Sequence, residues 1–230
     1  MKILGLIGGL SWESTAIYYR LINEATKAQR GGLHSAPMLL WSFDFAPIAE
    51  QQAAGAWSQL ATAMAEAARR LAAAGAEALI IASNTMHKLY DEIAASVAVP
   101  IPHIADATAA ALRARGCRKP ILLATSFTME EQFYRGRLLD RHGIAALVPD
   151  AAGRAIVHGV IYGELCRGIV RPESKSAYLT EIEKLARYGA DSVILGCTEV
   201  GMLIGQADVD LPVFDTTAIH ATAAVDFALG

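Results

Sequence analysis

The chain has 230 residues, of which 53% are hydrophobic and 19% are charged, enough for one large globular domain or two smaller ones. This composition excludes a disordered chain. The net charge is −3, and the 20 lysines and arginines are spread along the chain, so we expect no nucleic acid or membrane surface as a partner.

The first ten residues form an apolar run that is too short for a signal peptide, and no later stretch is long and uncharged enough for a membrane span. We therefore expect a cytoplasmic protein. The three cysteines, Cys117, Cys166 and Cys197, are far apart and lack the spacing of a zinc site. We expect neither a disulfide scaffold nor a metal.

Short runs typical of β-strands alternate with longer segments of helical periodicity. The expected strands are Ile3–Ile7, Met38–Phe43, Ala78–Ala82, Ile101–Ile104, Ile121–Ala124, Ala146–Val148, Val193–Leu195 and Val213–Phe214. The main expected helices are Ser14–Gln29, Trp57–Ala74, Met129–Arg141 and Ser174–Tyr188. This alternation predicts an α/β fold of parallel sheets flanked by helices, with functional groups just beyond the carboxyl ends of strands.

An internal repeat divides the chain into two similar halves. Residues 75–86 (GAEALIIASNTM) align without a gap with residues 189–200 (GADSVILGCTEV). Each segment has Gly-Ala-acid, an apolar strand and a small polar turn. Two weaker echoes follow the same order, since residues 9–13 resemble 126–130 and residues 102–106 resemble 212–215.

The repeat predicts two similar α/β domains, residues 1–104 and 105–230, related by a pseudo-twofold axis. Such an axis makes the carboxyl ends of the two sheets face one another across an interdomain cleft, which is where we expect the site. The register then sets Ser83 opposite Cys197. The last helix, residues 218–229, is a candidate to pack on the first domain.

Short polar turns follow several expected strands and open the next helix. They are Gly8-Gly9-Leu10-Ser11, Ser83-Asn84-Thr85, Thr125-Ser126 and Cys197-Thr198-Glu199. Helix starts bind carboxylates through backbone N–H groups, so a small carboxylate is the expected ligand. The glycines near residue 8 lack the G-x-G-x-x-G spacing of a dinucleotide site, and no G-x-S-x-G or H-E-x-x-H motif occurs.

Cys197 is the candidate reactive residue, because it stands at a strand-to-helix turn with hydroxyl and carboxylate neighbours. A helix N-terminus lowers the pKa of a thiol, and a shift from about 8.5 to about 7 makes about half of it thiolate at neutral pH. Such a thiol is a competent base or nucleophile. We expect the other two cysteines to be small buried residues, and His87, His103 and His220 to be packed or helix-capping.

Several motifs together resemble the aspartate/glutamate racemase family over essentially the whole chain. They are GGLSWEST at residues 8–15 with Tyr18-Tyr19, Gly31–Ser35, Asn84–Lys88, Leu195–Glu199 and Pro212–Thr217. The resemblance is strongest to the bacterial branch that acts on both acidic amino acids. Glutamate racemases of cell-wall synthesis usually have histidine where this chain has Glu199.

The resemblance implies racemisation of aspartate or glutamate without a cofactor, by two groups on opposite faces of the substrate. Cys197 would take the α-proton of the L-enantiomer. The resemblance also implies a homodimer. The residues implied to bind the substrate are Leu10, Ser11, Gln52, Asn84, Thr85, Thr198 and Glu199, with Asn84, Thr85 and Thr198 on the α-carboxylate and ammonium groups and Gln52 on the side-chain carboxylate.

The chain departs from the family pattern at two positions. Ser83 stands where two-base members have cysteine, and its hydroxyl is less acidic than a thiol by about 6–7 pKa units, taking an alcohol as similar to water. We therefore expect Ser83 to be a weak proton donor and the enzyme to exchange the α-proton of an L-substrate faster than it inverts it. Cys166, beside Arg167, stands where the family often has lysine, which leaves the cationic partner of the side-chain carboxylate open.

Two other functions fit the asymmetric pair of Ser83 and Cys197. Decarboxylases of disubstituted malonates keep only the second-domain cysteine, but they need an apolar pocket, whereas this chain continues Asn84-Thr85-Met86-His87. The other alternative is a non-catalytic protein that binds acidic amino acids. Such a protein would be stabilised by its ligand without exchanging any α-proton.

Overall fold

The computed structural model describes all residues from 1 to 230 and divides them into two compact units. Unit 1 comprises residues 1–103 and 220–230, and unit 2 comprises residues 104–219. The final helix therefore begins in unit 2 and ends in unit 1. No helix of the structure has the length and apolar character needed to cross a membrane.

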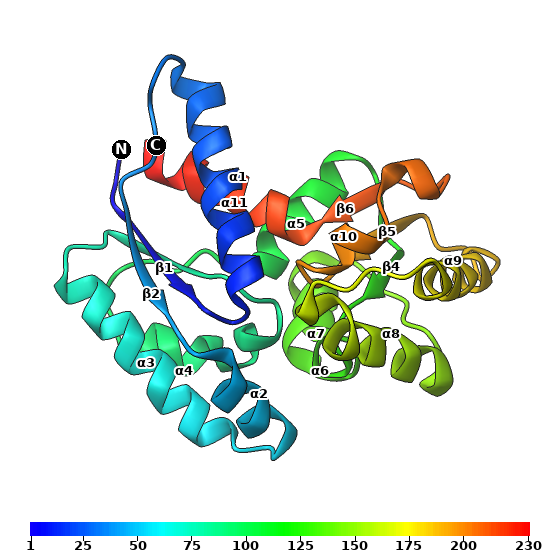
Figure 1. Cartoon of the computed structure of the whole chain (residues 1–230). Helices are drawn as coiled ribbons and strands as arrows, with labels where there is room; N and C mark the ends of the chain where they lie inside the picture. Colours follow the sequence, from blue (N-terminus) through cyan, green and yellow to red (C-terminus); the bar gives the residue numbers. More distant parts are fainter. The chain divides into compact units, whose positions relative to one another are not determined.

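Unit 1 is built on a parallel three-stranded sheet in the order β2-β1-β3 (Figure 1). Its strands are β1 (Leu4–Gly8), β2 (Met38–Ser42) and β3 (Ala78–Ile81). Its helices are α1 (Trp12–Arg30), α2 (Phe45–Ala53), α3 (Trp57–Ala73), the 3₁₀ helix η1 (Thr85–Leu89), α4 (Tyr90–Ala95) and the C-terminal part of α11 (Thr216–Leu229).

The sheet of unit 1 is covered on both faces. On one face, Ile7 and Ile81 pack with side chains of α3 and α4. On the other face, Leu6 and Ile80 pack with side chains of α1 and α11. Burial on both faces explains why β3 is apolar throughout rather than alternating between apolar and polar residues.

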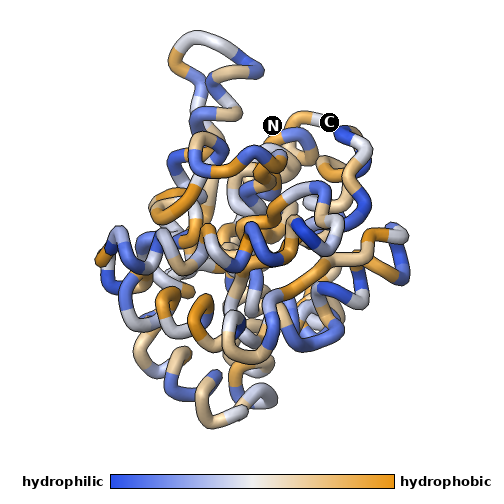
Figure 2. The backbone as a smooth tube through the Cα atoms, turned by 90° about the vertical axis from the view of Figure 1, so that its right-hand side faces the viewer, coloured by the Kyte–Doolittle hydropathy of each residue, from blue (hydrophilic) through white to orange (hydrophobic).

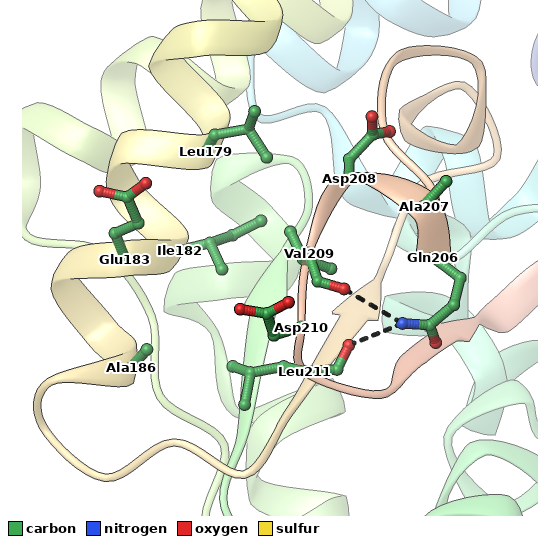
Figure 3. A pocket seen from close by; sticks show the side chains of 10 residues that line it. All are labelled: Leu179, Ile182, Glu183, Ala186, Gln206, Ala207, Asp208, Val209, Asp210 and Leu211. Atoms are coloured by element: carbon green, nitrogen blue, oxygen red, sulfur yellow. Dashed lines mark hydrogen bonds between the residues drawn. The ribbon is translucent and has the colours of Figure 1, made fainter.

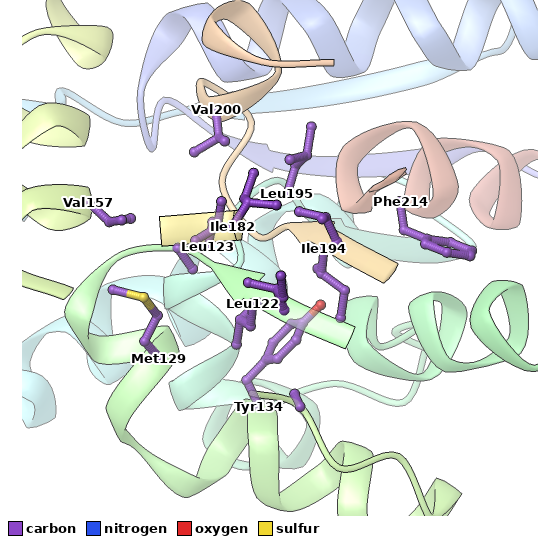
Figure 4. Packing of buried hydrophobic residues seen from close by; sticks show 14 of the residues in the cluster. Leu122, Leu123, Met129, Tyr134, Val157, Ile182, Ile194, Leu195, Val200 and Phe214 are labelled. Atoms are coloured by element: carbon purple, nitrogen blue, oxygen red, sulfur yellow. The ribbon is translucent and has the colours of Figure 1, made fainter. Parts of the chain in front are cut away.

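Unit 2 repeats this plan with a parallel sheet in the order β4-β5-β6. Its strands are β4 (Pro120–Leu123), β5 (Ser192–Leu195) and β6 (Val213–Asp215). Its helices are α5 (Ile104–Ala114), α6 (Ser126–Glu130), α7 (Gln132–His142), α8 (Ala151–Gly163), η2 (Leu165–Arg167), α9 (Pro172–Ala186), α10 (Val200–Leu203), η3 (Gln206–Asp208) and the start of α11. Figure 4 shows its core, where Leu122 and Ile194 lie near Tyr134 of α7 and Phe214 belongs to the same buried cluster.

Several helices bury one side and expose the other. In Figure 2 their colour alternates along the tube between hydrophilic blue and hydrophobic orange, as expected of helices that cover a sheet and face water. In α3, for example, Leu60, Met64 and Leu71 are buried, whereas Arg69 and Arg70 are exposed.

Three of the expected elements are wrong in detail. Residues 101–104 form no strand, because the prolines at 100 and 102 have no N–H to donate, and α5 begins at Ile104. Residues 146–148 contribute only an isolated parallel bridge, between Leu147 and Ile121, before Pro149 follows. The helix expected over residues 129–141 is broken at Glu131, whose backbone is extended.

The internal repeat reappears as matching hydrogen bonds. In unit 1 the Glu77 carboxylate accepts the backbone N–H of Ile3 at 2.7 Å, and in unit 2 the Asp191 carboxylate accepts that of Lys119 at 2.8 Å. Glu77 immediately precedes β3, and Asp191 immediately precedes β5. Each carboxylate thus binds the residue that immediately precedes the neighbouring strand, β1 or β4. The acid of the Gly-Ala-acid motif therefore has the same structural task in both units.

We expect Gly9→Ala to unfold unit 1 more easily. Gly9 has φ of +70°, and a Cβ there would overlap the backbone nitrogen of Phe43. Clash and strain together should lower the free energy of unfolding by more than about 3 kcal/mol. The measurement is urea unfolding followed by tryptophan fluorescence, which reports on unit 1 because Trp12, Trp41 and Trp57 all lie there.

Gly31→Ala is the matched control. Gly31 has φ of +73° but nothing within 4 Å of the added Cβ, so only the backbone strain of about 1 kcal/mol should be lost. Equal losses in the two variants would contradict the close approach of Gly9 to Phe43.

Candidate active site

The loop after β1 is closed by its own side chains. The Thr15 hydroxyl accepts the Gly9 N–H at 2.7 Å and donates to the Ser11 carbonyl at 2.9 Å. The Ser11 hydroxyl accepts the Ser14 N–H at 3.2 Å and so caps α1. Leu10, expected to bind substrate, has a buried side chain within the apolar core of this unit. Ser11 and Leu10 are thus held rigidly at the carboxyl end of β1.

Ser83 lies two residues beyond β3, at the same sheet edge as the loop after β1, because β1 and β3 run parallel. Its side chain is half-buried, and its hydroxyl accepts the Met86 N–H over a long 3.4 Å. Asn84 and Thr85, which follow it, are 5% and 6% exposed. The Ser83 hydroxyl keeps its own hydrogen to donate.

Gln52 reaches this turn from α2. Its side chain is buried, and Nε2 donates to the Met86 sulphur at 3.2 Å, one residue beyond Thr85. The structure therefore brings Gln52 to η1, the short helix that the turn of Ser83, Asn84 and Thr85 opens.

A buried cluster of histidines and tyrosines supports the Ser83 turn from behind. His87 donates from Nδ1 to the Ser83 carbonyl at 2.7 Å. The centroid of its ring lies 4.6 Å from that of His103 and 5.6 Å from that of His220. His220 bonds the Pro102 carbonyl through Nε2 at 3.0 Å and the Tyr18 hydroxyl through Nδ1 at 2.9 Å. Because a carbonyl only accepts, His220 carries its hydrogen on Nε2 and accepts the Tyr18 hydrogen on Nδ1.

Unit 2 presents the thiol. Cys197 lies two residues beyond β5, as Ser83 does beyond β3, and is half-buried. Its Sγ donates to Oε2 of Glu199 at 2.9 Å, and Glu199 is 3% exposed. Gly196 makes this turn possible, because a Cβ there would lie 2.7 Å from Leu122. Cys197, Thr198 and Glu199 are thus brought together.

The pKa of Cys197 is shifted in the direction opposite to the one expected from the sequence. Burial and the Glu199 carboxylate raise the pKa of this thiol well above its usual value. The helix that follows, α10, has only four residues and cannot supply the expected stabilisation of a thiolate. The resting form of Cys197 is therefore the thiol.

The start of α11 holds the Cys197 turn in place. The Thr216 hydroxyl donates to the Leu195 carbonyl at 2.8 Å, and the Thr217 hydroxyl donates to the Thr198 hydroxyl at 3.2 Å. Thr198 receives a hydrogen bond and so has its own hydrogen to give to a ligand. The sequence did not predict the roles of Thr216 and Thr217, although both lie in the Pro212–Thr217 motif. A motif does not show which residues elsewhere in the chain its side chains contact.

The remaining expected turn, Thr125-Ser126, is already occupied by a side chain. The Ser126 N–H donates to Nδ1 of His158 at 3.1 Å. The His158 imidazole thus accepts the hydrogen bond from the Ser126 N–H that we expected to bind a carboxylate.

A cavity of about 370 Å³ lies elsewhere in unit 2, and Figure 3 shows the side chains that line it. They come from α9 and from the segment leading into β6, where Gln206 donates to the Val209 and Leu211 carbonyls. None of the residues expected in the site lines it.

The chain resembles known proteins along its length. Residues 7–224 match the model of the Asp/Glu/hydantoin racemase family. A crystal structure of a candidate Asp/Glu racemase from Yersinia pestis is 51% identical, with both chains fully covered and a TM-score of 0.93. That of an aspartate racemase homologue from Pyrococcus horikoshii is 33% identical, also with full coverage of both, with a TM-score of 0.85.

A curated protein adds to these likenesses. The broad specificity amino-acid racemase of Bacillus subtilis is 23% identical over 171 residues, 73% of this chain and 71% of that protein. Fold and relatives together make this protein an isomerase, an amino-acid racemase. It belongs to the Asp/Glu/hydantoin racemase family. The fold class and the family expected from the sequence are confirmed.

We expect acid to destabilise unit 1 through His220. Burial lowers the pKa of His220 from 6.5 to about 4, so between these values the unfolded chain binds a proton that the folded unit does not. The stability that neutral His220 confers is complete above the unfolded pKa and falls by up to about 1.4 kcal/mol per pH unit below it. Urea unfolding of wild type, followed by tryptophan fluorescence, should show this loss on acidification from pH about 7 to about 4.5.

The double variant Tyr18→Phe/His220→Phe removes both members of the hydrogen bond and should lose less stability over the same pH range. His34→Gln is the control, because His34 is exposed and its replacement should leave the wild-type slope. Parallel slopes for wild type and the double variant would contradict a neutral His220 in the folded unit.

Proposed function

We propose that this racemase interconverts the L and D forms of aspartate and glutamate by acid–base chemistry of its own side chains. The substrate class is supported by the relatives from Yersinia pestis and Pyrococcus horikoshii, which are described as Asp/Glu and aspartate racemase proteins and cover the whole chain. Cys197 is the base for the L-enantiomer, and Ser83 is its weak partner. The turn that carries a half-buried thiol against a buried carboxylate is the observation that carries this proposal.

The polar turns provide the groups that an amino acid needs. Thr198 has a hydroxyl hydrogen directed by Thr217, while Asn84 and Thr85 bring an amide and a hydroxyl into buried positions. We assign these three residues to the α-carboxylate and ammonium groups of the substrate. Gln52, with its amide held at Met86, is assigned to the side-chain carboxylate, and Ser11 and the Leu10 backbone complete the site.

Ser83 limits the rate of inversion. An alcohol is a far weaker acid than a thiol and holds its proton too tightly to act as a base at neutral pH. Racemisation has an equilibrium constant of one, so kcat/KM is the same from L to D as from D to L. Ser83 therefore slows both directions, and an L-preference can appear only in KM, in kcat, or as exchange of the α-proton without inversion.

The proposal extends to assembly and location. Trp12 and Tyr19 lie seven residues apart on α1 and so share one face of the helix, yet they are 70% and 60% exposed. Large exposed aromatic residues on one face mark protein interfaces, which supports a homodimer. The three free cysteines suit a reducing compartment such as the cytoplasm.

We expect the chain to sediment as a dimer at micromolar concentration. The double variant Trp12→Glu/Tyr19→Glu should sediment as a monomer, because two carboxylates would then have to be buried in the interface. Tyr188 of unit 2, which is 74% exposed, provides the control. Tyr188→Glu should stay dimeric. A monomeric wild type would exclude this assembly.

We expect L-aspartate and L-glutamate to exchange their α-proton in deuterium oxide faster than they invert. Cys197→Ser should abolish both exchange and inversion. Ser83→Cys should raise inversion about tenfold or more, by the same factor in both directions, because a thiol replaces the poor partner. Proton NMR measures exchange, and chiral chromatography measures inversion.

Cys117→Ser is the matched control and should behave as wild type, because Cys117 is buried among apolar residues of unit 2. The proposal is wrong if D-aspartate exchanges as fast as L-aspartate and Cys197→Ser changes neither rate. Ligand-induced stabilisation with no exchange at all would instead identify a binding protein.

A further inference from the structure

The carbonyl of Ser83 is held by a side chain and not by the backbone. The N–H of His87, which an α-helix would direct to this carbonyl, donates instead to the Asn84 carbonyl at 3.1 Å. The His87 imidazole takes its place and donates from Nδ1 to the Ser83 carbonyl at 2.7 Å. Because a carbonyl only accepts, Nδ1 carries a hydrogen whether the ring is neutral or charged. The bond is therefore independent of the protonation state of His87.

The ring of His87 is fixed by other buried rings of unit 1. His87 is 1% exposed, and its ring is nearly parallel to that of Tyr90, with 7° between the planes and 6.3 Å between the centroids. The rings of His103 and His220 pack against it as well. Tyr90 and His220 are anchored in turn by hydrogen bonds to the backbone carbonyls of residues 101–102. An imidazole packed in this way cannot turn Nδ1 away from its carbonyl without displacing its neighbours.

The bond from His87 sets the orientation of the peptide group between Ser83 and Asn84. This peptide group is planar and trans, so its N–H points in the direction opposite to its carbonyl. With the Ser83 carbonyl directed toward the buried rings, the Asn84 N–H points away from them. The Ser83 hydroxyl has a weaker hold of its own, because its bond with the Met86 N–H is 3.4 Å long. The place of the hydroxyl is therefore set mainly by the backbone, and the backbone by His87.

We propose that His87 is a positioning residue for inversion, which holds the Ser83 hydroxyl where it can deliver a proton to the α-carbon of the substrate. This inference rests on the proposed function. In the delivery step the O–H bond of Ser83 breaks. The electron pair left when Cys197 removed the first α-proton forms the new C–H bond, and solvent then returns a proton to the oxygen. His87 gives up no proton itself and has no part in the removal of the α-proton.

Inversion and exchange depend on the Ser83 turn to different degrees. A displacement of about 1 Å in a reacting group can cost about 100-fold in rate, and inversion needs the Ser83 hydroxyl in place. Exchange without inversion needs only the thiol of Cys197, which removes a proton and returns a deuteron. A loss of folded protein or of substrate binding lowers both rates together. The ratio of the two rates in one sample therefore reports on the hydroxyl alone.

The decisive variant is His87→Leu, whose side chain has a similar volume but no donor. With L-aspartate in deuterium oxide, the ratio of D-aspartate formed to α-proton lost should fall about tenfold or more. His87→Asn keeps a donor nitrogen bonded to Cγ, as Nδ1 is, and should recover most of the wild-type ratio. Proton NMR measures the lost α-proton and chiral chromatography measures D-aspartate in the same reaction mixture.

Thr26→Val is the matched control. Thr26 is fully buried in α1, and its hydroxyl donates to the Ile22 carbonyl at 2.8 Å, so this change also removes a buried side-chain bond to a carbonyl of unit 1. It should lower the stability and leave the ratio unchanged.

A double-variant cycle tests whether His87 acts through the Ser83 hydroxyl. Ser83→Ala lacks the hydroxyl, so adding His87→Leu to it should slow the residual inversion no further than it slows exchange. A further loss of inversion alone in the double variant would overturn the inference, because His87 would then act by another route.

The remaining outcomes separate the inference from the proposed function. A wild-type ratio in His87→Leu, whether both rates fall together or neither changes, overturns the role of His87 and leaves the proposed function standing. A wild type that exchanges no α-proton overturns the proposed function and the inference with it. If His87→Leu does not fold, His87→Gln decides, because it keeps a donor but holds it one bond further from the backbone. Its ratio should fall, and a wild-type ratio in this variant would contradict the inference.

Discussion

The structure depends on one repeated contact, a carboxylate that holds the backbone at the start of a neighbouring strand. Glu77 does this for β1, and Asp191 does it for β4. For Asp191 the hydrogen bonds from Arg118, Ser192 and Lys119 outweigh the effect of burial and lower the pKa of its carboxyl, so the contact is made by the charged form at neutral pH. Because the starts of paired strands are aligned, their carboxyl ends are aligned too, and the polar turns end up at one edge of each sheet.

The two units surround their equivalent turn residues with opposite chemistry. The Ser83 turn is supported by imidazoles, because His87 bonds the Ser83 carbonyl and the rings of His103 and His220 pack against that of His87. Cys197 is surrounded by acids, and one of them touches its thiol. Similar backbones thus place a hydroxyl beside imidazoles in one unit and a thiol hydrogen-bonded to a carboxylate in the other. The asymmetry is in the side chains and not in the fold.

Much of this could be predicted from the sequence, because strand, turn and helix follow from local patterns. The alignment of residues 75–86 with 189–200 predicted two similar sheets, and each unit has one. The strand expected at 101–104 failed because two prolines remove the donors that a strand needs. The direction of the Cys197 pKa shift could not be predicted, because it is set by the burial of the thiol and by the rotamer that turns it to Glu199, while α10 is too short to oppose them. The hydrogen bond between His220 and Tyr18 could not be predicted for a different reason, because no local pattern shows that these two residues are in contact.

The division of unit 1 into two stretches of sequence bears on how the chain folds as it is made. Unit 2 is continuous, from residue 104 to residue 219, whereas unit 1 needs residues 220–230 to cover one face of its sheet. A ribosome delivers residues in order, so the first hundred residues emerge with Leu6 and Ile80 covered by α1 but not yet by α11. Unit 2 has its whole core available before the final turns of α11 are translated. The N-terminal part of the chain therefore cannot complete its fold until residues 220–230 have been made. Until then, the apolar face of its sheet is the surface that a chaperone would protect.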